Sequence, residues 1–131
     1  MLKGVLHPED AELALAAGAD GIVVSNHGGR ALDSAIAPID ALPAIVDAVG
    51  GRMTVFLDSG VRRGSDLVKA VALGADAVLA GRAPLYGLAA CGEPGVARVL
   101  DLLRSETVRT MAMLGARTVD EIRAALEPRR Q

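Results

Sequence analysis

A repeated pattern of helix, Gly-Ala-Asp turn and short apolar run restricts the fold of this chain more than any other feature. Ala-Gly-Ala-Asp-Gly-Ile-Val-Val at residues 17–24 is echoed by Leu-Gly-Ala-Asp-Ala-Val-Leu-Ala at residues 73–80. Gly18 and Gly74 are 56 positions apart, which corresponds to two strand–helix units of about 28 residues each. Such a repeat predicts a βα barrel or an open, doubly wound parallel sheet.

Short apolar runs mark the expected strands. Parallel strands are buried on both faces and therefore read as nearly continuous hydrophobic sequence. Residues 1–5 read as the tail of a strand, and the other expected strands are residues 21–25, 54–58 and 77–80.

Helical spacing fills the intervals between these runs. Pro8 suits a first helical turn, and Gly18 and Gly74 suit the position just past a helix end. Thr118-Val-Asp-Glu121 reads as a capping box that opens a final helix. The expected helices are residues 8–17, 39–49, 65–73, a short one at 84–90, 95–114 and a last one ending at about Leu126, before a frayed end at 128–131.

Composition predicts one domain, residues 1–131, and excludes several classes of function. Hydrophobic residues make up 51% of the chain, which argues against disorder. A net charge of −2 gives no reason to expect nucleic acid or an acidic membrane as a partner. The single Cys91 excludes an internal disulfide and a cysteine-cluster metal site. No apolar stretch approaches the ~20 residues of a membrane span, so we expect a cytoplasmic protein without a metal.

Each expected strand runs into polar or glycine-rich sequence. The four segments are Lys3-Gly4, Ser25-Asn-His-Gly-Gly-Arg30, Asp58-Ser-Gly-Val-Arg-Arg-Gly64 and Gly81-Arg82. Because the carboxyl ends of parallel strands share one face, these segments are expected to converge. The sequence therefore predicts a ligand site there.

His27 and Arg30 are the pair of residues best suited to catalytic chemistry. A histidine can accept a proton near neutral pH, and an arginine can hold a carboxylate with two parallel hydrogen bonds. The alternative is a loop histidine satisfied by the backbone beside a solvated arginine. The other histidine, His7, precedes Pro8 and is expected to cap a helix or lie on the surface.

The segment 58–64 and the pair Gly81-Arg82 are typical of phosphate loops. Glycine-rich turns leave backbone N–H groups free, and helix N-termini attract anions. In βα barrels a phosphate commonly binds at the loops after the last two strands. The alternative is ordinary turn glycines with surface arginines.

The motif at residues 25–30, followed by Leu32 and Asp33, resembles the active-site motif of the FMN-dependent L-2-hydroxy acid dehydrogenases and oxidases. The similarity continues in the family's order through residues 2–5, 58–64, 74–77 and 80–82. It covers nearly the whole chain. Ser59 stands where the family often has glycine. An isomerase-type FMN barrel is the less favoured alternative, because Arg30 is suited to a carboxylate.

The resemblance implies a role for each matched residue. His27 would be the active-site base and Arg30 the carboxylate clamp, both contacting a small 2-hydroxy acid. Lys3 would stabilise negative charge on the reduced FMN ring, and Ser25 would bond the flavin. The rest of the cofactor, ribityl chain and phosphate, would be held by Asp58, Ser59, Gly60, Arg62, Gly81 and Arg82.

The resemblance also implies an α/β fold that is the C-terminal half of a (β/α)8 TIM barrel: about four parallel strands with helices, plus C-terminal helices. The absent half would bring further flavin contacts, a tyrosine and the aspartate that orients the histidine. We therefore expect weak or no activity from the chain alone, and a partner that is an N-terminal half-barrel or another copy. The alternative function is a non-catalytic half-barrel that binds phosphate or FMN and self-associates through its open edges.

Overall fold

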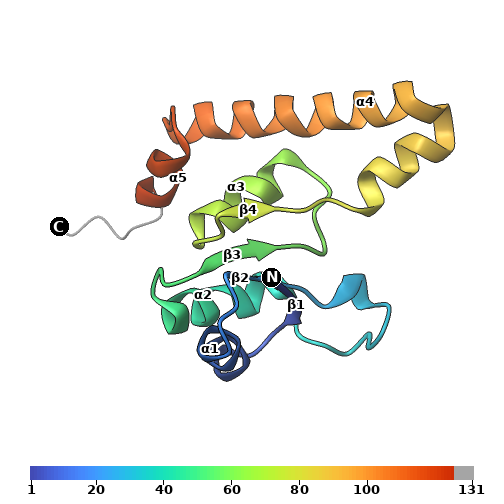
Figure 1. The fold of residues 1–131 in the computed structure, drawn as a ribbon. Coiled ribbons are helices and arrows are strands. Elements are labelled where there is room, and N and C mark those ends of the chain that lie inside the picture. Colours follow the sequence, from blue (N-terminus) through green and yellow to red (C-terminus); the bar gives the residue numbers. More distant parts are fainter. Residues whose placement is uncertain (126–131) are drawn as a thin grey trace. The chain divides into compact units, whose positions relative to one another are not determined.

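The computed structural model describes residues 1–125 of the 131. Strands and helices alternate along them (Figure 1), in the order β1 (Leu2–Val5), α1 (Pro8–Ala16), β2 (Gly21–Val24), the 3-10 turn η1 (His27–Gly29), α2 (Pro38–Val49), β3 (Thr54–Leu57), α3 (Gly64–Ala72), β4 (Ala77–Val78), α4 (Arg82–Leu114) and α5 (Val119–Ala125). The expected helix end at Leu126 and the frayed segment 128–131 lie outside the described residues.

The chain divides into two compact units. The first unit comprises Met1–Gly60 with Gly74–Leu79, and carries the sheet with α1 and α2. The second unit comprises Val61–Leu73 with the chain from Ala80 onward, and carries α3, α4 and α5. The expectation of a single domain over residues 1–131 stays a prediction.

The sheet of the first unit is parallel throughout, in the order β1-β2-β3-β4. The predicted strands are confirmed: β1 ends at Val5 as expected, whereas β2, β3 and β4 end one or two residues before the expected position. Ser25 and Asp58 leave their strands, although the Ser25 and Asp58 N–H groups still donate to Val5 O and Val24 O at 3.4 and 3.1 Å. Their side chains bond to polar neighbours, so these two residues begin the loops that carry chemistry.

The core of the first unit lies between the sheet and the helices α1 and α2, which also pack on each other. Ile22, Leu42 and Ile45 are fully buried in it, and each contributes about 1.5–3 kcal/mol by leaving water. Gly18 and Gly74 follow their helices with φ of +82° and +103° as expected, a region where a Cβ is disfavoured. A Cβ on Gly74 would also lie 2.7 Å from Val46 Cγ1.

The second unit is helical, with α3 packed against α4 and α5. Its core contains the buried residues Val68, Ala116 and Ile122. The predicted short helix at 84–90 and the helix at 95–114 belong to one element, α4, which is interrupted where Cys91 and Gly92 leave helical geometry.

The predicted capping box at α5 is only half right. Thr118 Oγ1 does accept from Glu121 N, at 3.2 Å. The Glu121 carboxylate, however, accepts from Arg117 N at 2.6 Å, one residue before the predicted donor. An ion pair between Arg117 and Glu121, with 3.3 Å between Nη2 and Oε1, holds it in that position.

Candidate functional site

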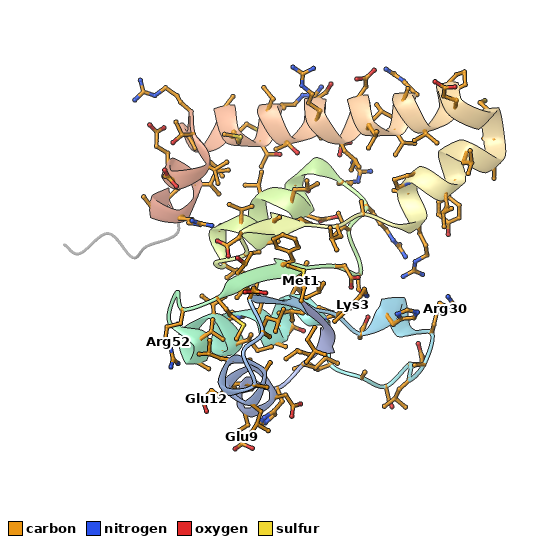
Figure 2. All side chains as sticks on the ribbon, viewed as in Figure 1. Met1, Lys3, Glu9, Glu12, Arg30 and Arg52 are labelled. Carbon is orange, nitrogen blue, oxygen red and sulfur yellow. The ribbon has the colours of Figure 1, made fainter. Side chains whose placement is uncertain are left out.

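Three of the predicted cofactor residues meet at the carboxyl edge of the sheet. Lys3 lies on β1, and Ser25 and Asp58 directly follow β2 and β3. Lys3 Nζ donates to Ser25 Oγ at 2.8 Å and lies 2.6 Å from Asp58 Oδ2. Figure 2 labels Lys3 on β1. The convergence expected of parallel strands is thus observed for these residues.

Ser25 is 1% exposed, and its hydroxyl connects the strand edge to the following loop. Besides the Lys3 ammonium, its Oγ accepts the backbone N–H of His27 at 3.0 Å. A buried hydroxyl without partners would be destabilising, so these bonds let serine occupy the position. Ser25 therefore fixes where the histidine loop leaves the sheet.

The loop after β2 holds His27 in an unusual backbone conformation. His27 has φ of +59°, and Gly28 and Gly29 follow with φ of +72° and +76°. Asn26 Oδ1 accepts from Gly28 N at 3.0 Å, which closes a tight turn. The side chains of His27 and Arg30 are exposed on this loop, where Figure 2 labels Arg30. Within residues 1–125 neither side chain makes a hydrogen bond or ion pair, so both can meet a ligand.

Ser59 joins the loop after β3 to the histidine loop. Its hydroxyl donates to Asp58 Oδ1 at 2.7 Å and accepts from Gly28 N at 3.0 Å. Ser59 itself has φ of +71°. The next residue, Gly60, has φ of +78°, and a Cβ there would meet nothing within 4 Å. The backbone at Gly60 is therefore open to a ligand.

Opposing effects act on the Asp58 carboxyl. Burial by itself would raise its pKa, because a charged carboxylate loses solvation. The hydrogen bonds from Lys3, Ser25 and Ser59, with the charge of Lys3, outweigh burial and hold the pKa of Asp58 below its ordinary value. Asp58 is therefore ionised in the folded chain at neutral pH and balances the Lys3 ammonium.

Protonation of Asp58 in acid should lower the free energy of unfolding of the chain. Its folded-state pKa lies below the ordinary 3.8, so its contribution is complete above the unfolded-state pKa and is lost as pH falls through the folded-state pKa. Lys3 is 44% exposed, so solvent screens the pair and we expect less than about 1 kcal/mol. Urea unfolding between about pH 5 and pH 2 measures this. Asp58→Asn should make the free energy of unfolding depend less on pH, whereas Asp47→Asn, on the surface of α2, should leave this dependence unchanged. An equal dependence on pH in both variants would contradict the prediction.

The remaining predicted cofactor residues, Arg62, Gly81 and Arg82, belong to the second unit. The backbone amides near Arg62 were expected to be free, and that expectation is wrong. Asp66 Oδ2 accepts from Arg62 N and Arg63 N at 3.0 and 2.9 Å, and Glu106 Oε2 accepts from Gly64 N at 2.9 Å. These carboxylates already occupy the N-terminus of α3. The Arg62 side chain itself is exposed.

The N-terminus of α4 is different. Gly81 is its N-cap and no side chain caps it. A Cβ on Gly81 would meet nothing within 4 Å, and Arg82 supplies an exposed guanidinium at the first helical position. Helix N-termini of this kind attract anions. Of the two predicted phosphate loops, this one keeps an open backbone.

Sequence reasoning missed Asn26 and Glu106. Asn26 shapes the histidine loop, and an asparagine before Gly-Gly at a strand end is a recognisable turn signal. Glu106 lies 42 positions beyond Gly64 on α4, and no local pattern indicates that contact. His7 caps α1 as expected, accepting from Glu9 N at 3.4 Å. Across residues 1–125, no helix combines the length and apolar character needed to cross a membrane.

Four parallel strands with their polar residues at one edge define a piece of a βα protein whose site lies at the strand ends. The model of the FMN-dependent dehydrogenases matches residues 1–128. The chain therefore belongs to the FMN-dependent dehydrogenase family, as its motifs indicated.

Named relatives agree with this assignment. An L-lactate oxidase of Lysinibacillus sphaericus (strain C3-41) is 54% identical over 123 residues, which cover 94% of this chain and 32% of the relative. Among solved structures, a mandelate oxidase variant with a monooxide FMN adduct gives a TM-score of 0.89 at 50% identity, covering 93% of this chain and 39% of that one. Mandelate oxidase with benzoyl-formic acid gives 0.90 at 50% identity, covering 93% and 37%.

The chain thus spans 32–39% of the length of these relatives. The sheet is part of a (β/α)8 barrel, and the predicted fold class is confirmed.

Proposed function

We propose that this chain is the part of an FMN-dependent L-2-hydroxy acid oxidase or dehydrogenase that supplies the base, the carboxylate clamp and part of the cofactor site. The complete enzyme would oxidise a 2-hydroxy acid of the lactate, glycolate or mandelate class to the 2-keto acid. The hydrogen-bonded group of Lys3, Ser25 and Asp58 beside the His27 loop is the observation that carries the proposal.

The residues present fit FMN. A flavin ring that becomes anionic needs a fixed positive charge, and the Lys3 ammonium is partly exposed at the strand edge. A phosphate needs open backbone amides and cations, which the α4 N-terminus at Gly81 and Arg82 offers, together with the exposed Arg62. Ser25, Asp58, Ser59 and Gly60 would supply further polar contacts to the cofactor.

When bound, FMN would accept the two electrons that leave the substrate. His27, whose imidazole is exposed on the loop after β2, would take the substrate's proton. Arg30 would hold the carboxylate through a two-pronged hydrogen bond and so orient the α-carbon. Asp58 would keep the Lys3 ammonium in place through their ion pair. The substrate is accordingly a small anion with a hydroxyl next to its carboxylate.

We further propose that an N-terminal half-barrel completes the site. The outer edge of β1 pairs with no strand among the described residues. Beside it runs a groove of about 420 Å³, lined by Leu2, Lys3, Gly4, Val5, Asp10, Leu13, Ala14 and Ala17. An open parallel edge with an apolar groove fits another strand followed by a helix. A second copy of this chain is the alternative occupant. A cytoplasmic location stays a prediction from composition.

Binding and reduction of FMN test the proposal. The chain alone is expected to bind FMN weakly and turn over little. A chimera in which it replaces the matched segment of the lactate oxidase relative should bind FMN and lose visible flavin absorbance when L-lactate or mandelate is added without oxygen. Lys3→Met should weaken FMN binding about tenfold, a loss of about 1.4 kcal/mol, and Lys69→Met on α3 should not. A folded chimera that binds FMN yet shows no bleaching with any 2-hydroxy acid would rule the activity out.

A further inference from the structure

Two non-glycine residues in the described part of the chain adopt positive φ, and they are neighbours in space. They are His27, at +59°, and Ser59, at +71°. Left-handed backbone is unfavourable for residues that carry a Cβ, and it persists where surrounding contacts impose it. Such strain often lies at functional sites, so the contacts of these two residues indicate what the strain achieves.

Hydrogen bonds link the two strained positions. Gly28, directly after His27, donates its N–H to Ser59 Oγ at 3.0 Å. The same hydroxyl donates to Asp58 Oδ1 at 2.7 Å. His27 N is held on its other side by Ser25 Oγ at 3.0 Å. The backbone around His27 is thus tied to both β2 and the loop after β3.

A glycine at position 59 would adopt this φ without strain. It would, however, remove the hydroxyl that accepts from Gly28 N and donates to Asp58 Oδ1. Asn26 Oδ1 also accepts from Gly28 N, but Asn26 lies in the same loop and moves with it. The strained serine therefore adds a tie between two loops that a glycine could not supply.

We propose that Ser59 is a positioning residue for His27, and that its hydroxyl fixes the conformation of the histidine loop against the loop after β3. The role of His27 as base rests on the proposed function, whereas the tie itself does not. Through Asp58, the same hydroxyl connects the histidine loop to the Lys3 ammonium. One series of hydrogen bonds and an ion pair thus links the backbone next to His27 with the Lys3 ammonium.

The tie is tested first in the chain without FMN, by NMR. Ser59→Ala removes the hydroxyl and keeps the strained backbone, whereas Ser59→Gly removes the hydroxyl and also relieves the strain. Both should speed hydrogen exchange at the Gly28 amide about fivefold to tenfold and shift the carbon resonances of His27. Ser34→Ala, exposed in the same loop, is the matched control and should change neither. If Ser59→Gly leaves the Gly28 exchange rate and the His27 resonances unchanged, the proposal is overturned. Because glycine relieves the strain, Ser59→Gly tests the proposal even if Ser59→Ala does not fold.

The positioning role is tested in the lactate oxidase chimera. Ser59→Gly should lower kcat for flavin reduction about tenfold with little change in KM, because His27 is misplaced while Arg30 still binds the carboxylate. An unchanged kcat would overturn the positioning role. Absence of turnover in the chimera that retains Ser59 would instead count against the proposed function, and the exchange measurement would still decide the tie.

Discussion

Replacing His27 with asparagine in the lactate oxidase chimera is expected to slow flavin reduction by L-lactate about a thousandfold. The amide of asparagine cannot take a proton at neutral pH. Asparagine tolerates left-handed backbone better than most residues, so it suits the φ of +59° at this position. The substitution therefore removes the base and leaves the loop intact. Rapid-mixing absorbance of the flavin measures the effect.

Arg30→Met provides the comparison that identifies the two roles. It should raise the KM for 2-hydroxy acids at least about tenfold, because a charge-assisted pair of hydrogen bonds to the carboxylate is lost. Arg109→Met, exposed on α4, is the matched control and should leave KM unchanged. If His27→Asn keeps the full rate of flavin reduction while FMN stays bound, another group is the base and the assignment is wrong.

The gathering of Lys3, Ser25 and Asp58 was predictable because it follows from strand direction alone. Each residue ends or follows an apolar run, and parallel strands present their carboxyl ends at one edge. Nothing about the side chains had to be known for that inference. The family motif added roles to residues that topology had already brought together.

The hydrogen bonds that link the two loops of the site could not be predicted, because they depend on backbone dihedral angles. The bond from Gly28 N to Ser59 Oγ requires positive φ at both His27 and Ser59. A sequence pattern gives no warning of positive φ at a serine, since turn rules assign such positions to glycine and asparagine. From the sequence, Ser59 was only a departure from glycine, and its bonding partners became visible in three dimensions.

The loop at residues 58–64 shows the same limit for distant contacts. Its glycines and arginines predicted free backbone amides, but carboxylates of Asp66 and Glu106 occupy them. Glu106 comes from a helix that begins 18 residues beyond Gly64. Local composition cannot show that a remote helix will satisfy a helix terminus. Gly64 closes the segment predicted to be a phosphate loop, and the structure buries it against α4.

Gly64→Ala is accordingly expected to destabilise the second unit by about 3 kcal/mol. A Cβ at this position would clash with the backbone nitrogen of Thr107 and lie 2.6 Å from the carbonyl carbon of Glu106. Backbone atoms cannot rotate away as a side chain can, so α3 and α4 would have to separate. That movement would also stretch the bond from Gly64 N to Glu106 and expose the core around Val68.

The sign of the change makes this substitution informative. In an open helix, alanine would be about 1 kcal/mol more favourable than glycine, so a glycine that served only as a flexible turn would give a gain in stability. Gly81→Ala is the matched control, since a Cβ there meets nothing within 4 Å and φ is −105°. Urea unfolding, with hydrogen exchange of the α3 and α4 amides, measures both variants. A Gly64→Ala chain as stable as the Gly81→Ala chain would show that α3 and α4 do not approach as closely as this structure has them.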